Sequence, residues 1–126
     1  MIEGVNNGET FKLVSHSMGG AFSIGVKKYL EEQGWTVESS VFINTFQSHK
    51  VSNPKDATFV VDYQDTNDPV LFWLDPNLGK GEIENSDVQI RVKSDEKTEY
   101  IHRSPIDSGQ KFWDELLKII NEILNQ

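Results

Sequence analysis

The chain has 126 residues, of which 20 are acidic and 12 basic, so its net charge is −8. This length suits one domain spanning residues 1–126, and the absence of cysteine excludes disulfide frameworks and thiolate sites. The negative charge argues against nucleic acid as a partner. The lack of a signal-like start or of a ~20-residue apolar run predicts a cytoplasmic protein without a membrane span.

The first predicted elements are a strand over residues 11–14, a sharp turn over 15–20 and a helix over 21–33. The helix is indicated by apolar residues at helical spacing, and Gly34 is well placed to end it. The apolar residues at this spacing are Phe22, Val26, Tyr29 and Leu30.

Two continuous apolar runs follow, within residues 37–45 and 58–61, and such runs are typical of strands covered on both faces. Residues 88–92 alternate between apolar and polar, which predicts a half-exposed strand at a sheet edge. The last segment predicts an amphipathic helix. Its apolar stripe comprises Phe112, Leu116, Ile119, Ile120, Ile123 and Leu124. Together these elements predict an α/β fold with a mostly parallel sheet and flanking helices.

The turn Ser15-His16-Ser17-Met18-Gly19 has the pattern small-x-Ser-x-Gly between a strand and a helix. A nucleophile elbow needs this pattern, because its serine adopts a strained conformation and bulky neighbours would clash. The alternative is a serine that only caps the following helix.

The segment His16-Ser17-Met18-Gly19-Gly20 resembles the elbow of lipases and esterases with the α/β-hydrolase fold. The resemblance implies a triad in the order serine, acid, histidine, with the acid after the second strand beyond the elbow. Asp68-Pro69-Val70 resembles the acid turn of this family, so Asp68 is the expected acid. Asp65 is the fallback, and Asp62 is expected at the strand end.

His102 has the position of the family's base, after the last predicted strand and before the terminal helix, whereas His49 precedes the acid. The backbone N–H of Met18 is the expected oxyanion donor. The resemblance therefore implies a serine hydrolase of carboxylic esters, with a small ester or lipid-like substrate. No cofactor is expected, and no metal site either, because neither calcium-loop nor zinc-ligand spacing occurs.

The family's strands that precede the elbow strand have no counterpart in these residues, which predicts a truncated α/β-hydrolase fold. One edge of the elbow strand would then be bare and one oxyanion donor absent, so activity could be weak or lost. We expect a homodimer, or an upstream chain that completes the fold. The alternative function is a non-catalytic remnant or interaction module completed by another chain.

Overall fold

The computed structural model describes residues 8–68, 71, 81–94 and 109–125. Its described strands form one sheet in the order β1-β2-β3-β4, and every neighbouring pair is parallel. The strands are β1 (Thr10–His16), β2 (Thr36–Ile43), β3 (Phe59–Asp65) and β4 (Val88–Val92). The described helices are α1 (Gly19–Glu32), the short 3₁₀ helix η1 (Ser48–Lys50) and α5 (Gln110–Leu124).

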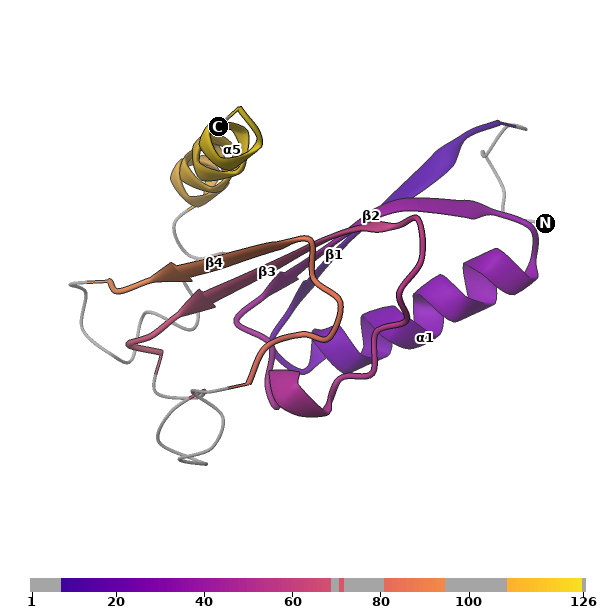
Figure 1. Cartoon of the computed structure of the whole chain (residues 1–126), viewed down its shortest axis with the longest axis horizontal. Coiled ribbons are helices and arrows are strands. Elements are labelled where there is room, and N and C mark those ends of the chain that lie inside the picture. The colour runs from indigo at the N-terminus through magenta and orange to yellow at the C-terminus, as the bar shows by residue number, and fades with distance from the viewer. Residues whose placement is uncertain (1–7, 69–70, 72–80, 95–108, 126) are drawn as a thin grey trace.

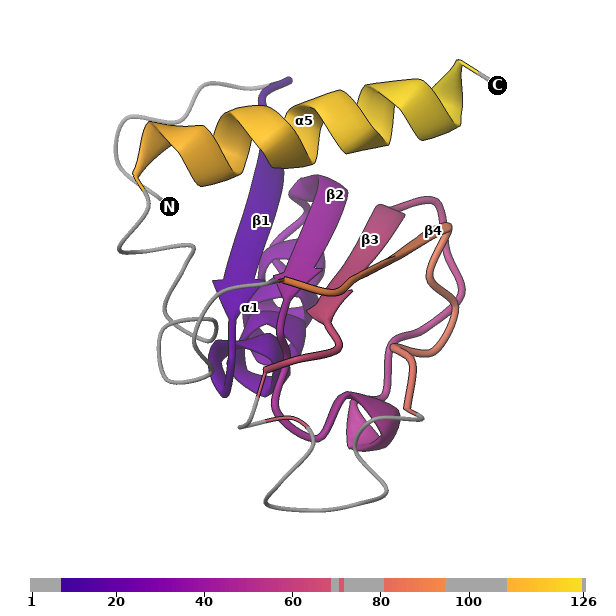
Figure 2. The same ribbon diagram turned by 90° about the vertical axis from the view of Figure 1, so that its left-hand side faces the viewer.

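Helix α1 covers one face of the sheet and α5 crosses the other (Figures 1 and 2). The expected α/β class, with a parallel sheet between helices, is confirmed. In the described part of the chain, no helix is long and apolar enough to cross a membrane.

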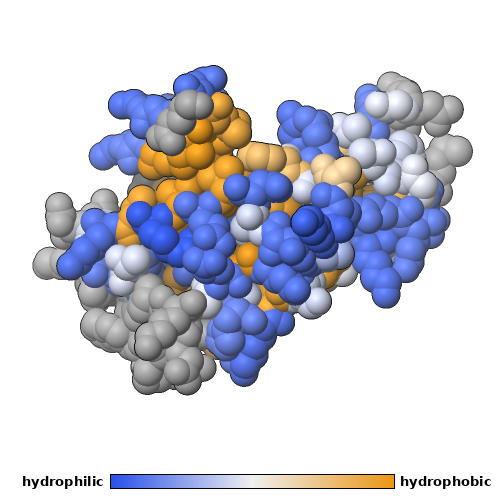
Figure 3. Space-filling model, viewed as in Figure 1, coloured by the Kyte–Doolittle hydropathy of each residue, from blue (hydrophilic) through white to orange (hydrophobic). Residues whose placement is uncertain are grey.

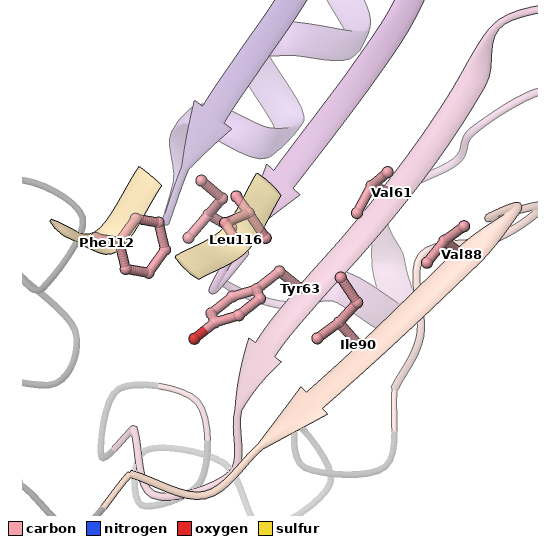
Figure 4. Packing of buried hydrophobic residues seen from close by; sticks show 7 residues of the cluster. Val61, Tyr63, Val88, Ile90, Phe112 and Leu116 are labelled. Atoms are coloured by element: carbon pink, nitrogen blue, oxygen red, sulfur yellow. The ribbon is translucent and has the colours of Figure 1, made fainter. Parts of the chain in front are cut away.

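Hydrophobic side chains fill both faces of the sheet, as the apolar runs of β2 and β3 predicted. On the α5 face, Tyr63 packs edge-on against Phe112 with ring centroids 5.5 Å apart (Figure 4). The buried cluster on this face comprises Ile43, Val61, Tyr63, Val88, Ile90, Phe112 and Leu116. A second cluster on the α1 face comprises Phe42, Val51, Val60 and Ile83, with Ile24 against it.

The four apolar residues whose spacing predicted the helix do not form the buried face of α1. Phe22 is 76% exposed and Tyr29 57% exposed, while only Leu30 of the four is buried. The side facing inward carries Gly20, Ser23, Lys27 and Leu30 instead. The small residues Gly20 and Ser23 lie near the N-terminus of α1, and Gly20 there packs closely against Thr45.

Lys27 is accommodated on the buried side of α1 because two carboxylates neutralise it. Its ammonium group lies 2.7 Å from Glu31 and 2.5 Å from Asp56. Burial by itself lowers the pKa of Lys27, but the hydrogen bonds to Asp56 and Glu31 outweigh burial and raise that pKa. Asp56 lies in the connection between β2 and β3, so its ion pair with Lys27 fastens α1 to this connection, whereas Glu31 belongs to α1 itself.

Helix α1 runs to Glu32, and Gly34, two residues later, is the helix-terminating glycine that the sequence predicted. Gly34 has φ +86°, and its N–H donates to Glu31 O at 3.0 Å while Trp35 N–H donates to Leu30 O at 2.9 Å. These two bonds form a Schellman motif, whose left-handed residue favours glycine.

The two edges of the described sheet are β4 and β1. In β4, Val88 and Ile90 are buried while Gln89 is exposed, which confirms the predicted half-exposed edge strand. In β1, Val14 is 56% exposed. Hydrophobic surface also gathers on and below α5 (Figure 3).

Candidate active site at the carboxyl edge of the sheet

The expected nucleophile and acid follow strands that end at the same edge of the sheet. Ser17 comes directly after β1, and Asp68 comes three residues after β3. Because all four strands are parallel, their carboxyl ends meet at one edge, where open α/β sheets bind their ligands. The strand before Asp68, β3, is second from β1 in the sheet, which is the order expected for the acid and the nucleophile.

Ser17 has φ +56°, a left-handed conformation that is uncommon for a serine. Its N–H donates to Ile43 O at 3.1 Å. Its carbonyl accepts from the N–H groups of Gly20 and Phe46, both at 3.2 Å. Such a conformation costs about 1–3 kcal/mol and persists only where surrounding contacts impose it.

The small residues around Ser17 permit close packing. A Cβ on Gly19 would lie 4.0 Å from Ser15 Cβ, whereas a Cβ on Gly20 would lie only 2.4 Å from Thr45 Cγ2. Met18 immediately precedes α1, and its side chain is 71% exposed. The first N–H groups of a helix lack intrahelical partners and carry partial positive charge, which suits an anion.

Two buried carboxylates lie at the end of β3: Asp65 is its last residue, and Asp68 is in the loop that follows. Asp65 Oδ1 accepts from Asn67 N at 2.9 Å and from Ser94 N at 3.2 Å. Asp65 O accepts from Asp68 N at 3.0 Å, and the side chain of Asp68 is fully buried. Asp65 thus fixes the shape of the loop on which Asp68 lies.

Asn44 was not singled out by the sequence. It follows β2 directly with φ +44° and is fully buried between the elbow and the acid loop. Its Oδ1 accepts from Asp65 N at 2.8 Å, and its own N–H donates to Tyr63 O at 2.8 Å. Its Nδ2 has no hydrogen-bond partner among the described residues.

Tyr63, near the carboxyl end of β3, lies on the face of the sheet that α5 covers. Burial, together with the negative charges of Asp65 and Glu115, raises the pKa of Tyr63 to about 12. The phenol therefore stays neutral at physiological pH. A hollow of about 230 Å³ next to Tyr63 and Asp65 is not lined by Ser17, so we do not assign it to the substrate.

Asp62 lies within β3 as part of a buried polar network. Its Oδ2 accepts from Ile83 N and from Arg91, each at 3.0 Å. Gln64 Nε2 donates to Ser48 Oγ and to Gly81 O, also at 3.0 Å. This network joins η1, β3 and the segment before β4, so Asp62 has a structural role.

His102, the expected base, lies outside the described residues. Of the other histidines, His16 is the last residue of β1 and His49 is in η1. Within the described segments, no group of three or more His, Asp or Glu side chains is arranged to hold a metal ion.

Comparison of the chain with protein-family models, with curated proteins and with solved structures found no significant match.

Proposed function

We propose that this chain is a serine hydrolase of carboxylic esters with a truncated α/β-hydrolase fold, in which Ser17, Asp68 and His102 form the triad. The observation that carries the proposal is the left-handed Ser17 in the β1–α1 turn. A helix-capping serine has no need of this conformation, since a capping residue adopts extended dihedral angles. A nucleophile elbow requires a sharp, strained turn.

In the proposed reaction, Ser17 Oγ attacks the ester carbonyl while His102 accepts the hydroxyl proton. The N–H of Met18 stabilises the resulting oxyanion. The tetrahedral intermediate collapses to an acyl-enzyme, and the alcohol leaves with the proton from His102. A water molecule, deprotonated by His102, then releases the carboxylic acid and restores Ser17.

Asp68 is favoured over Asp65 as the acid because Asp68-Pro69-Val70 resembles the acid turn of the family, and because the Asp65 carboxylate already binds the main chain. Asp65 Oδ1 is occupied by two backbone N–H groups of its own loop and of the β4 end. A triad acid instead directs its carboxylate to the imidazole, which it orients and stabilises as the cation. Asp68 is the other buried carboxylate of this loop.

Hydrolysis of short-chain p-nitrophenyl esters tests the proposal. Ser17→Ala should lower turnover by about 10⁴-fold or more, as loss of a triad nucleophile does. Ser52→Ala is the control, because Ser52 is exposed and lies in the β2–β3 connection. Equal turnover by Ser17→Ala and the wild type would contradict the proposal.

A second candidate is an interaction module, which is favoured by exposed apolar residues on β1, in the turn after it and on α1. Val14 on β1, Met18 in the turn and Phe22 on α1 are 56%, 71% and 76% exposed. Strand edges and apolar patches of this sort pair with other chains. We propose a second copy as the occupant, because antiparallel pairing of two β1 strands about Leu13 sets Lys12 opposite Val14 and opposes no like charges.

Sedimentation at micromolar concentration measures this association. The wild type should be heavier than the 14.4 kDa monomer, and Val14→Lys should return it to that mass. A wild type that sediments as a monomer would contradict the homodimer. A complementing chain that then binds in a Val14-dependent way would identify the alternative occupant.

A further inference from the structure

The end of β2 and the loop that follows it, residues 43–46, bind the main chain of Ser17 at two points. Ile43 O accepts from Ser17 N at 3.1 Å, and Phe46 N donates to Ser17 O at 3.2 Å. The position of Ser17 is therefore tied to this loop.

Asn44 lies inside the same loop and reaches the acid loop with its side chain. Its Oδ1 accepts from Asp65 N at 2.8 Å, and Asp65 O accepts from Asp68 N at 3.0 Å. Asn44 is fully buried, so loss of its oxygen would leave the Asp65 N–H without a partner. The Asn44 side chain thus connects the segment that binds the Ser17 main chain to Asp65, which in turn binds the main chain of Asp68.

The far side of the acid loop is fastened independently to β4. Thr66 N donates to Val92 O at 2.7 Å, and Asn67 Nδ2 donates to Ser94 O at 2.6 Å. These bonds fix the loop to the sheet edge away from Ser17. On the side toward Ser17, the Asn44 side chain accepts from Asp65 N.

We propose that Asn44 is a positioning residue that sets the place of Asp68 relative to Ser17. The proposal rests on the ester hydrolase function proposed above. Asparagine suits the position because it tolerates left-handed φ better than most residues and its amide oxygen accepts the Asp65 N–H. A displacement of about 1 Å in a catalytic group can cost about 10²-fold in rate.

Asn44→Gly is the informative variant, because glycine keeps the left-handed backbone and removes only the side chain. Asn85→Gly is its matched control. Asn85 also has left-handed φ, at +57°, and its Nδ2 donates to Asn53 O at 2.8 Å. It precedes β4, at the opposite end of the sheet from Ser17.

The first readout is the rate at which a fluorophosphonate probe labels Ser17, measured against probe concentration. Asn44→Gly should lower the maximal labelling rate by about 10- to 100-fold with the half-saturating concentration unchanged. Asn85→Gly should label as the wild type does. An unchanged maximal rate in Asn44→Gly would overturn the proposal.

The second readout is amide hydrogen exchange, which does not depend on reactivity. The N–H groups of Asp65 and Asp68 should exchange slowly in the wild type and faster in Asn44→Gly, but not in Asn85→Gly. Fast exchange at Asp65 in the wild type would overturn the proposal even if Asn44→Gly failed to fold. A wild type that does not label would contradict the hydrolase function, and exchange would still decide whether Asn44 holds the loop.

Discussion

Replacing Gly20 by alanine tests how closely α1 packs against Thr45 in the loop after β2. The added Cβ would lie 2.4 Å from Thr45 Cγ2 and 2.9 Å from Thr45 Oγ1. Thr45 is fully buried and β-branched, so its side chain has little freedom to turn away. Overpacking of this kind costs about 1–3 kcal/mol.

The clash outweighs the helical preference for alanine over glycine, which is about 1 kcal/mol. Because a 2.4 Å approach is severe, the free-energy cost of the clash should lie in the upper part of the overpacking range. After the helical preference for alanine is subtracted, Gly20→Ala should destabilise the fold by about 1–2 kcal/mol. Gly25→Ala is the control within α1, because its Cβ would meet nothing within 4 Å. It should stabilise by about 0.5–1 kcal/mol.

Urea unfolding followed by tryptophan fluorescence measures both variants. Thr45→Ser removes the closest carbon, so combining it with Gly20→Ala should recover about 1 kcal/mol relative to the sum of the single changes. The reasoning is refuted if Gly20→Ala is as stable as Gly25→Ala, or if the two changes simply add.

Two further predictions concern the acid loop and the buried lysine. Asp68→Asn should lower ester turnover by about 10⁴-fold and Asp65→Asn by less than about tenfold, since the amide oxygen at position 65 can still accept; the reverse order would make Asp65 the acid. The pKa of Asp56 is lowered, by the bonds from Lys27 and Thr58 acting against burial. The stability gained from this carboxylate is therefore present above its ordinary value of 3.8 and lost as pH falls through the lowered pKa. Urea unfolding of the wild type and of Asp56→Asn should give free energies of unfolding whose difference is largest at pH 6 and shrinks as pH falls below 3.8. A difference that does not change with pH would contradict the linkage.

The sequence was sufficient for the described strands and for a sharp turn at Ser17. Both depend on neighbours in the chain: continuous apolar runs mark β2 and β3, and small residues at positions 15 and 19 permit the turn at Ser17. The choice of Asp68 over Asp65 remains a prediction, as does His102.

The buried face of α1 could not be predicted because its decisive partner is distant in sequence. Lys27 faces inward because Asp56, 29 residues later, neutralises it. Phe22 and Tyr29 formed an equally good helical stripe, and periodicity alone does not rank two such stripes. Asn44 was missed for the same reason, since its bond to Asp65 spans 21 residues and depends on the arrangement of β2 and β3.

The central claim is that Ser17 is an activated nucleophile, and site-mapped labelling with a fluorophosphonate tests it most directly. The probe phosphonylates a reactive serine with loss of fluoride, and intact mass followed by peptide mapping locates the adduct. One adduct is expected, on Ser17, and it should be absent from Ser17→Ala and retained in Ser52→Ala. No adduct on folded wild type while an active esterase in the same tube is labelled, or an adduct that persists in Ser17→Ala, would contradict the claim.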